Sequence, residues 1–358
     1  MRIPLLRAYY LLRRGLNGPL DPGVQRMREF RDEFYRRVWQ EAAEQAGARW
    51  SACSAAVADI VSAHGRLRVS NNVTSLDDPA TLLLAGDKPA VYRLLAKSGV
   101  VVPRHVVLAA NRADRLERTL NTIGPPLVVK PATDTGSGHG VSTNVMTRRQ
   151  LRHAFAWACA HGQRVLIERQ IEGHCFRVLI LDGEVLDTVK RRRVSFVGDG
   201  RSTIRSLIAR ENALRLESGT ERAQVLIRRD PDLGNTLLAQ GLRLRSRPRA
   251  GARIELKRVV NDNGTDENEA ACGVLCPAIL HSARRAAQAV GLRLAGVDII
   301  CRDASVPLEQ SGGAVIEVNA TPGFHYHYHR RGERCEIAAK ILEAAFGHAD
   351  RAATVHAL

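Results

Sequence analysis

The first hydrophobic pattern along the chain is that of one long helix. Between Asp21 and Gly47, apolar side chains recur at three- and four-residue spacing with charged side chains between them, which is typical of a half-buried helix. Pro22 suits the first turn of that helix, and Gly47 suits its end. The short run Arg66–Val69 predicts a strand, so residues 1–80 are expected to form an N-terminal α/β unit.

Short apolar runs separated by turn residues follow this unit. A helix that carries Lys88 is predicted from Thr81 to Gly99, because glycine is a common residue at a helix end. Strands are then predicted at Val100–Pro103, Pro126–Lys130 and Arg164–Glu168.

A hairpin and an arginine-rich stretch come next. Asp182-Gly183 separates two apolar runs, Phe176–Leu181 and Glu184–Asp187, and this dipeptide in that position is a strong signal for a tight β-hairpin. Residues 200–257 are rich in arginine and poor in long apolar runs. They predict an exposed, helical excursion from the main sheet.

The last part of the chain predicts the order helix, strand, strand, helix. The first helix runs from about Cys276 to Val290, and the two strands cover Leu294–Ile300 and Gly313–Asn319. An amphipathic helix at Cys335–Phe346 closes the fold.

The composition is that of a folded, globular protein. Hydrophobic residues make up 45% of the 358 residues, and no apolar run approaches the roughly 20 residues that span a bilayer. Arg7 interrupts the apolar N-terminal stretch, so no signal peptide is predicted. The seven cysteines are scattered and odd in number, which favours a reducing, cytoplasmic location over a disulfide framework.

The formal net charge is +16, which favours an anionic partner. Nucleic acid is the obvious class of partner. However, the basic residues are not interleaved with aromatic ones, and no nucleic-acid-binding motif is present. A basic nucleic-acid-binding protein is therefore kept as a second hypothesis, and recognition of an acidic carrier protein through the arginines as a third.

The two late strands carry the strongest chemical signal. Asp298 lies on the first, and Glu317 and Asn319 lie two positions apart on the second, so the side chains of the latter pair point to the same face. Three oxygen-bearing side chains on neighbouring strands suit magnesium bound to nucleotide phosphates. Buried carboxylates without a cation would repel one another. The alternative for this pattern is a strand with one solvated polar face.

A second group of residues suits phosphate binding. Lys88 and the strand-ending Lys130 precede the glycine-rich stretch Gly136-Ser-Gly-His-Gly140. A glycine-rich turn lets backbone N–H groups approach phosphate, and lysine supplies a compact positive charge. The spacing matches neither the Walker pattern nor the dinucleotide fingerprint, so alone the stretch would suit a plain turn. Its position between a strand-ending lysine and the later carboxylates favours phosphate binding.

Together these residues resemble an ATP-grasp ligase, most of all the ATP-grasp portion of cyanophycin synthetase and of the bifunctional glutathione synthetases. The resemblance runs from about residue 77 to residue 346. It is densest in Val128-Val-Lys-Pro131, Phe176-Arg-Val-Leu-Ile-Leu-Asp-Gly183, Val197-Gly-Asp-Gly-Arg-Ser-Thr-Ile204, Ala295-Gly-Val-Asp298 and Ile316-Glu-Val-Asn-Ala-Thr-Pro-Gly-Phe324. It implies an α+β, ATP-grasp fold in which two α+β subdomains hold ATP.

The resemblance also implies a division of the chain. Residues 1–80 would be a pre-grasp-like N-terminal α/β unit, and residues 81–165 the small subdomain with the lid. Residues 166–348 would be the C-terminal subdomain, which includes the arginine-rich excursion at 200–257, and residues 349–358 a tail.

Each matching residue receives an implied role. The residues implied to bind ATP are Lys88 and Lys130, the lid residues Gly136, Ser137, Gly138, His139 and Gly140, and the hinge residues Glu168, Arg169, Gln170 and Ile171. Two magnesium ions, with manganese as an alternative, would be held by Asp298, Glu317 and Asn319. Arg177 and Arg191 would lie near the γ-phosphate and the acyl intermediate.

The implied reaction is ADP-forming amide-bond formation. A carboxylate attacks the γ-phosphate to give an acyl phosphate, and an amine of an amino acid or short peptide then displaces phosphate. A homodimer is kept as a hypothesis for the assembly. Asn261–Asp266 replaces the Ser-Thr-Gly-Gly substrate loop of the similar proteins, and only Asn261 and a glycine fit, so a different substrate is expected. The chain has no room for a second, Mur-ligase-like module, so cyanophycin synthesis is not expected.

Three histidines alternate with tyrosines directly after the last predicted strand. If this segment is extended, His325, His327 and His329 share one face, as in a transition-metal site. Similar proteins place histidine here beside the acceptor pocket, which favours a substrate-lining role for His325 and His327. A solvated loop is the third alternative.

Overall fold

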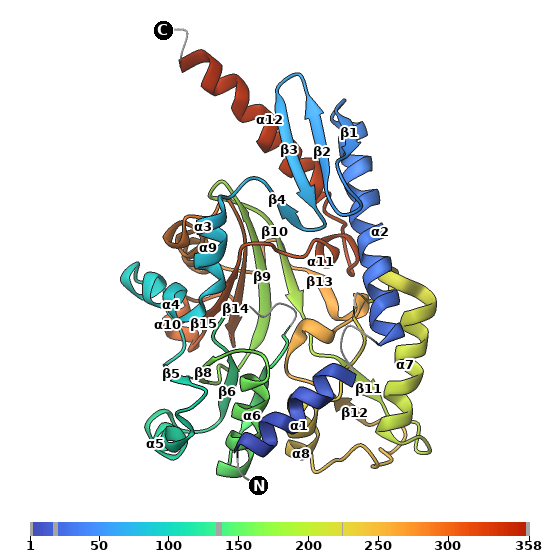
Figure 1. Cartoon of the computed structure of the whole chain (residues 1–358), viewed down its shortest axis with the longest axis vertical. Helices are drawn as coiled ribbons and strands as arrows, with labels where there is room; N and C mark the ends of the chain where they lie inside the picture. Colours follow the sequence, from blue (N-terminus) through green and yellow to red (C-terminus); the bar gives the residue numbers. More distant parts are fainter. Residues whose placement is uncertain (1–2, 17–20, 134–137, 224, 356–358) are drawn as a thin grey trace.

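The chain folds into β-sheets surrounded by helices (Figure 1). The computed structural model describes residues 3–16, 21–133, 138–223 and 225–355. Within these ranges there are an N-terminal four-stranded sheet, a central five-stranded sheet, a second four-stranded sheet and a two-stranded ribbon. None of the helices in these ranges is both long enough and apolar enough to cross a bilayer.

The N-terminal sheet packs against two long helices, one from each end of the chain. Its antiparallel strands are β1 (Arg49–Ala52), β2 (Ala58–Ser62), β3 (Gly65–Ser70) and β4 (Val73–Thr74). The helices are α2 (Pro22–Gln45) and α12 (Ile337–Val355). Helix α2 begins after Asp21, whose carboxylate accepts hydrogen bonds from the backbone N–H groups of Gly23 and Val24. Trp39 of α2 and Ile341 of α12 belong to one buried apolar cluster with the sheet.

Helix α1 (Ile3–Leu16) lies apart from this sheet, at the opposite end of the molecule (Figure 1). Its Leu6 and Tyr10 pack against Ala156 and Ala160, in and just after helix α6 (Arg148–Cys159). The first 80 residues therefore contact two separate parts of the fold.

The second four-stranded sheet carries the glycine-rich stretch between two of its strands. Its spatial order is β5 (His105–Ala109), β8 (Arg164–Arg169), β6 (Leu127–Pro131) and β7 (Ser142–Val145). Helices α5 (Leu116–Ile123) and α6 pack on it through Leu120 and Phe155. The predicted boundary after residue 165 falls inside β8, which pairs with β6 as far as Arg169.

The predicted helix from Thr81 to Gly99 is wrong in one respect, because it is two helices. These are α3 (Pro79–Gly86) and α4 (Lys88–Lys97). Asp87 separates them, since its carboxylate accepts a hydrogen bond from the backbone N–H of Ala90 and so begins a new helix. Lys88 consequently lies in a first helical turn, where its position is fixed by the cap.

The predicted strand at Val100–Pro103 is also absent. The segment forms no ladder, although the carbonyl oxygen of Val101 accepts a hydrogen bond from the N–H of Val315 at 2.9 Å. An extended chain with one such bond satisfies the backbone there without a strand pair.

The central sheet brings the remaining predicted strands together. Its spatial order is β13 (Asn268–Ala270), β10 (Glu184–Arg191), β9 (His174–Leu181), β14 (Leu294–Cys301) and β15 (Ala314–Asn319). The predicted hairpin of β9 and β10 is confirmed, and Asp182 and Gly183 have φ of 50° and 84°, the positive values that its two-residue turn requires. Helix α9 (Pro277–Val290) packs on the sheet, and both contribute to the largest apolar cluster described.

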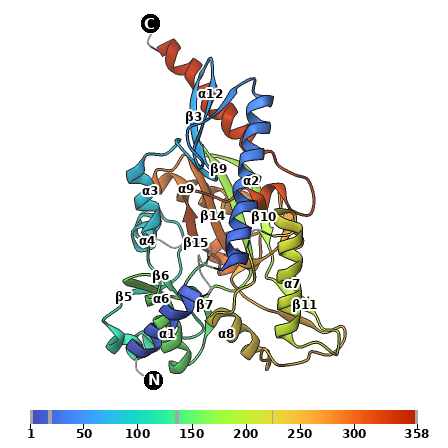
Figure 2. The ribbon, with the colours of Figure 1, turned by 45° about the vertical axis from the view of Figure 1, so that its right-hand side comes forward.

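The arginine-rich excursion (residues 200–257) contains helices, as predicted, and also buries apolar side chains. It contains α7 (Ile204–Ser218), α8 (Pro231–Ala239) and β12 (Arg253–Glu255), which pairs with β11 (Ser195–Val197). Ile204, Leu233 and Ile254 form a small core of its own. Figure 2 shows α7 and α8 beside the central sheet and the second four-stranded sheet. Shorter helical pieces are η1 (Ala113–Arg115), η2 (Gly219–Glu221), η3 (Val260–Asp262), η4 (Thr265–Glu267), α10 (Leu308–Ser311) and α11 (His325–Tyr328).

Candidate active site

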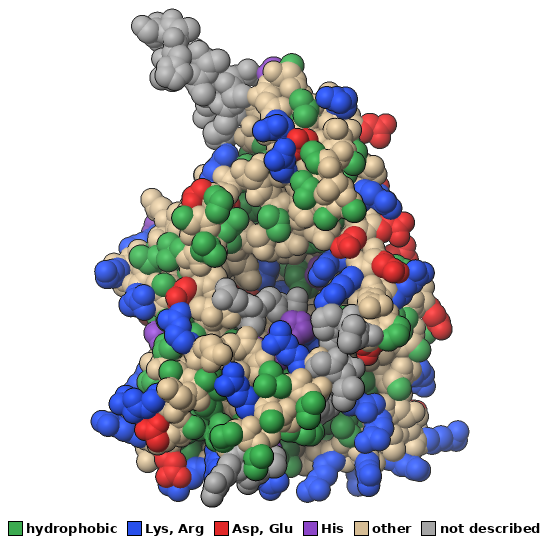
Figure 3. Space-filling model, viewed as in Figure 1, with side chains coloured by type: hydrophobic (Ala, Val, Ile, Leu, Met, Phe, Trp, Pro, Cys, Tyr) green, Lys and Arg blue, Asp and Glu red, His purple; other side chains and the backbone are tan. Residues whose placement is uncertain are grey.

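A cavity of about 920 Å³ is lined by residues of the central sheet and of the second four-stranded sheet. Figure 3 shows a hollow near the middle of one face, with Lys and Arg side chains around it. Residues from distant parts of the chain reach this cavity, among them Arg31 of α2, Lys130 of β6, Arg177 of β9, Arg253 of β12 and Glu317 of β15. Segments far apart in the sequence therefore meet in one place.

Basic side chains outnumber acidic ones in the lining. The ten basic residues are Arg31, Lys88, Lys130, Arg177, Lys190, Arg191, Arg192, Arg193, Arg253 and Arg258. The five acidic residues are Glu168, Glu172, Glu255, Asp298 and Glu317. This excess gives the cavity a positive potential, which suits a ligand with several negative charges.

The candidate metal ligands lie side by side on β14 and β15. Asp298 is the direct cross-strand partner of Glu317, and Asn319 is the partner of Gly296. The Asn319 amide donates to the carbonyl oxygen of Gly296 at 3.1 Å, and no described residue donates to its side-chain oxygen. Two carboxylates and one amide oxygen are the hard donors that magnesium prefers, so these side chains fit that ion. In the described ranges no group of three or more His, Cys, Asp and Glu side chains is arranged to hold a metal ion, so the amide is needed as a third donor.

Asp298 also has arginine partners. The Arg177 Nε and Nη2 atoms lie 2.5 and 2.8 Å from its two carboxylate oxygens, and Arg191 Nη1 lies 3.7 Å from one of them. Burial alone would raise the pKa of Asp298, but the charge and hydrogen bonds of Arg177 keep it below its usual value. Asp298 is therefore ionised, and a bound metal ion would share it with Arg177.

The two predicted phosphate-binding lysines have different surroundings. Lys88 Nζ lies 3.5 Å from a carboxylate oxygen of Glu317 and is part of the cavity lining. Lys130 Nζ lies 2.8 Å from Glu168 Oε1 and also donates to the hydroxyl of Tyr92 at 3.1 Å. Tyr92 in turn donates to Glu168 Oε2 at 2.9 Å. Lys130 is thus held by a buried network, whereas Lys88 lies beside Glu317 of the candidate metal site.

The predicted hinge is fixed from both sides. Gln170 accepts a hydrogen bond from the backbone N–H of Asn144 at 2.8 Å and donates to Glu172 at 2.7 Å. The Arg169 side chain turns away from the cavity and donates to the carbonyl oxygen of Gly124 at 2.9 Å. Glu168, Gln170 and Ile171 line the cavity. The backbone of this segment is therefore a rigid edge along the cavity.

The described end of the glycine-rich stretch packs against the segment that follows the excursion. A Cβ atom on Gly138 would lie 2.8 Å from Asn261 Nδ2 and 2.9 Å from Val259 Cγ1, and the φ of Gly138 is +66°. Gly138 lines the cavity, whereas His139 and Gly140 do not. Gly136 and Ser137 lie outside the described residues.

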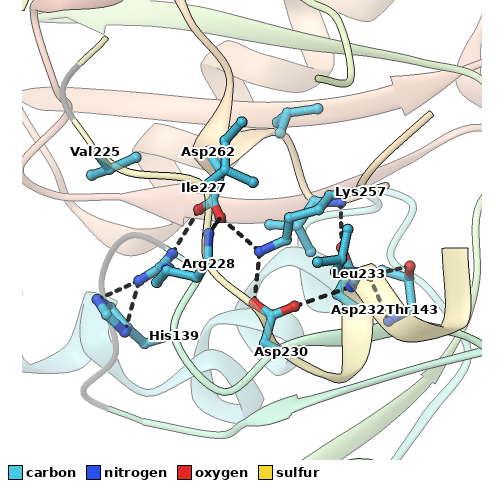
Figure 4. A network of polar contacts seen from close by, with 12 residues as sticks. His139, Thr143, Val225, Ile227, Arg228, Asp230, Asp232, Leu233, Lys257 and Asp262 are labelled. Carbon is cyan, nitrogen blue, oxygen red and sulfur yellow. Dashed lines mark hydrogen bonds and ion pairs between the residues drawn. The ribbon is translucent and has the colours of Figure 1, made fainter. Parts of the chain in front are cut away.

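His139 is fixed by a network of buried charges (Figure 4). Arg228 Nη1 lies 2.8 Å from His139 Nδ1, and Arg228 Nη2 lies 2.7 Å from Asp262. Burial and the neighbouring Arg228 charge lower the pKa of His139 to about 3, so the ring is neutral. Lys257 Nζ lies 2.6 Å from Asp230 and 2.7 Å from Asp262.

A second contact joins the same network to β7. The backbone N–H of Thr143 donates to Asp232 Oδ1 at 3.0 Å, and the Asn235 amide donates to the carbonyl oxygen of Thr143 at 2.9 Å. The glycine-rich stretch and the strand that follows it are therefore both attached to the excursion or the residues directly after it.

The tight contact at Gly138 leads to a prediction. We expect Gly138→Ala to lower the ATP turnover that the family resemblance implies about tenfold or more, because the added methyl group displaces Asn261 and strains a backbone with positive φ. Steady-state kinetics with varied ATP would measure the effect. Gly251→Ala is the matched control, since Gly251 has φ +79° but nothing within 4 Å of the added Cβ. Equal effects of the two variants would contradict the role given to this contact.

The histidine segment is not extended, so the alternative in which the three histidines share one strand face does not apply. Residues His325–Tyr328 form the helical turn α11. His325 lines the cavity, but His327 is fully buried outside the lining, where its Nδ1 lies 2.5 Å from Asp187. Arg330 Nη1 lies 2.5 Å from the same carboxylate. Hence His327 contributes to holding α11 in place, and the structure offers it no contact with a ligand in the cavity.

The cavity gathers most of the predicted site residues. Those in its lining are Lys88, Lys130, Gly138, Glu168, Gln170, Ile171, Arg177, Arg191, Asn261, Asp298, Glu317, Asn319 and His325. Asn261 Oδ1 accepts a hydrogen bond from Arg191 at 3.0 Å. Sequence reasoning missed Arg31, Tyr35 and Asn72, which line the cavity, and Tyr92, which holds Lys130. Their only signal in the sequence is their type, because each is brought to the site by long-range packing.

Comparisons with known proteins agree with this arrangement. Residues 94–199 match the family described as D-ala D-ala ligase C-terminus. The cyanophycin synthetase of Trichormus variabilis is 32% identical over 266 residues, which is 74% of this chain and 29% of that protein. The glutathione biosynthesis bifunctional protein of Listeria innocua is 29% identical over 277 residues, which is 76% of this chain and 36% of that protein. The chain thus spans about a third of the length of these relatives.

A solved structure shows the same fold. The crystal structure of a bifunctional glutathione synthetase from Pasteurella multocida matches with a TM-score of 0.53 at 22% identity, covering 85% of this chain and 42% of that one. The central and second four-stranded sheets, with the cavity that both line, are consistent with the α+β architecture predicted from the sequence. The chain therefore has the ATP-grasp fold and is a member of the ATP-grasp superfamily.

Proposed function

We propose that this protein is an ATP- and magnesium-dependent, ADP-forming ligase that joins a carboxylate to the amine of an amino acid or short peptide. The observation that carries the proposal is the meeting of Lys88, Asp298, Glu317 and Asn319 in one positively charged cavity. The similarity to cyanophycin synthetases and glutathione biosynthesis proteins supports the reaction class.

ATP would bind between the central sheet and the second four-stranded sheet. The backbone of residues 168–171 would contact the adenine, and Lys88 and Lys130 would neutralise phosphate charge. Asp298, Glu317 and Asn319 would hold magnesium, which stabilises the charge that develops on transferring phosphoryl oxygens. Gly138 would approach the phosphates closely, since it has no side chain.

The reaction would have two steps, phosphoryl transfer to the carboxylate and acyl transfer to the amine. A substrate carboxylate oxygen attacks the γ-phosphorus, the bond to the β,γ-bridging oxygen breaks, and ADP leaves. The amine then attacks the acyl carbon, the carbon–oxygen bond to phosphate breaks, and the amine proton passes to solvent. Arg177 and Arg191, both buried in the lining, would stabilise the negative charge of the acyl phosphate and of the departing phosphate.

The proposal is tested by trapping the intermediate. With ATP, magnesium and a panel of amino acids and dipeptides, we expect carboxylate-dependent ADP release, and hydroxylamine in place of the amine should give the substrate hydroxamate. Mass spectrometry identifies the hydroxamate and an enzyme-coupled assay measures ADP. ADP release that does not respond to any carboxylate, with no hydroxamate formed, would contradict the ligase function.

A further inference from the structure

One end of the cavity is lined by the N-terminal part of the chain. Arg31 and Tyr35 lie one turn apart on α2, and Asn72 lies between β3 and β4; all three line the cavity. The Tyr35 hydroxyl accepts a hydrogen bond from the N–H of Phe324 at 3.0 Å, and Asn72 Nδ2 donates to the carbonyl oxygen of Thr321 at 2.5 Å. These contacts fix the N-terminal unit against the segment that follows β15, so the backbone of α2 that carries Arg31 is held beside the cavity, and the Arg31 side chain itself is 39% exposed.

The Arg31 guanidinium has no hydrogen-bond partner among the described residues. Its Nε is buried without an acceptor. In the described part of the chain its one carboxylate contact is Asp32, whose Oδ1 lies 4.0 Å from Nε and already accepts a hydrogen bond from Asn71. A buried N–H without an acceptor is destabilising, and an anionic ligand would remove that cost.

Arg191 and His325 present further buried atoms without partners at the same end. Neither Nε nor Nη1 of Arg191 donates a hydrogen bond in the described part of the chain, although the Arg191 side chain is wholly buried. His325 Nδ1 is likewise buried without a partner. The Tyr326 ring lies between these groups, with its centroid 4.0 Å from the Arg191 guanidinium carbon and 3.6 Å from the His325 ring centroid.

The charges here do not balance. Asp298 is the acidic lining residue that faces Arg177 and Arg191, and Arg177 already occupies both of its oxygens. In the proposed reaction Arg177 and Arg191 act on the phosphate and the acyl group. The positive charge of Arg31 is left for a group that does not react.

We propose that this end of the cavity binds a second carboxylate of the substrate, and that Arg31 is the residue that selects for it. The inference rests on the proposed ligase function and makes its substrate an acidic amino acid or an acidic short peptide. A planar guanidinium matches a carboxylate with two parallel hydrogen bonds, which a neutral amide cannot reproduce.

The experiment compares each acidic substrate with its neutral amide. ADP release is measured with L-glutamate and L-glutamine, with L-aspartate and L-asparagine, and with dipeptides that contain them. We expect wild type to prefer the acidic member by at least about tenfold in kcat/KM. Arg31→Gln should abolish that preference by raising KM for the acidic amino acid or dipeptide, with KM for ATP unchanged, and Arg31→Lys should restore part of it. Arg36→Gln is the matched control, because Arg36 is an exposed arginine of the same helix outside the cavity lining.

The outcomes separate this inference from the ligase function. Turnover with the same acid-to-amide preference in wild type, Arg31→Gln and Arg36→Gln would overturn the subsite and leave the ligase function intact. If no carboxylate elicits ADP, the ligase function fails, and calorimetric binding of L-glutamate without ATP then decides. Binding that Arg31→Gln weakens at least tenfold supports the subsite; absent binding, or binding equal in the two proteins, overturns it.

Discussion

Glu317→Gln is expected to lower the rate of carboxylate-dependent ADP formation by about a thousandfold. The change keeps the size of the side chain but removes the charge that would help to hold magnesium beside Asp298 and Lys88. Loss of one preorganised electrostatic group costs about 3–4 kcal/mol of transition-state stabilisation, and about 4 kcal/mol corresponds to a thousandfold in rate. Stability should change little, because the Glu317 side chain is 28% exposed and its ion pair with Lys88 spans 3.5 Å.

The measurement is steady-state ADP release over a range of magnesium concentrations, with thermal unfolding to verify the fold. Glu309→Gln is the control, since Glu309 lies exposed on α10 and away from the cavity. A Glu317→Gln protein that is folded and works within threefold of wild type would remove Glu317 from the metal site.

Lys257→Met is expected to lower the free energy of unfolding by about 3–5 kcal/mol, the usual cost of removing one partner from a buried ion pair. Lys257 is 1% exposed and lies 2.6 Å from Asp230 and 2.7 Å from Asp262. The burial of Lys257 alone would lower its pKa, but the two aspartates raise it above its usual value, so the ammonium is charged. Without it, Asp230 and Asp262 would lose a shared cation and repel each other (Figure 4).

Urea unfolding followed by circular dichroism measures this loss. Arg284→Met is the comparison, because Arg284 and Glu184 form an exposed pair at 3.3 Å, whose removal should cost about 1 kcal/mol or less. If the two variants unfold at the same urea concentration, the buried network does not stabilise the excursion.

The candidate metal site could be predicted because its signal is local. Glu317 and Asn319 lie two positions apart on a strongly apolar strand, and the period of a strand alone places them on one face. The preceding apolar strand with Asp298 had to pair nearby, and the register confirms that Asp298 lies opposite Glu317. The roles of these side chains as metal ligands stay predictions.

Other features were out of reach or misread for physical reasons. The break at Asp87 has a local signal, an N-cap residue two positions before Pro89, which helical periodicity outweighed. The alternating histidines fit a single helical turn as well as a strand, because four residues are too few to separate the two periods. Tyr92 and Arg31 reach the cavity by tertiary packing, and no local pattern encodes a contact such as that of Tyr92 with Lys130.

The attachment of β7 to α8 affects how long a product would stay bound. Thr143 is hydrogen-bonded to Asp232 and Asn235, and His139 to Arg228, so residues 138–143 can withdraw only if they break these contacts or carry the excursion with them. A short loop alone moves within nanoseconds to microseconds, whereas collective motion of packed helices takes microseconds to milliseconds. The dwell time of ADP, and with it the exchange of spent for fresh nucleotide, should therefore follow the motion of α7 and α8.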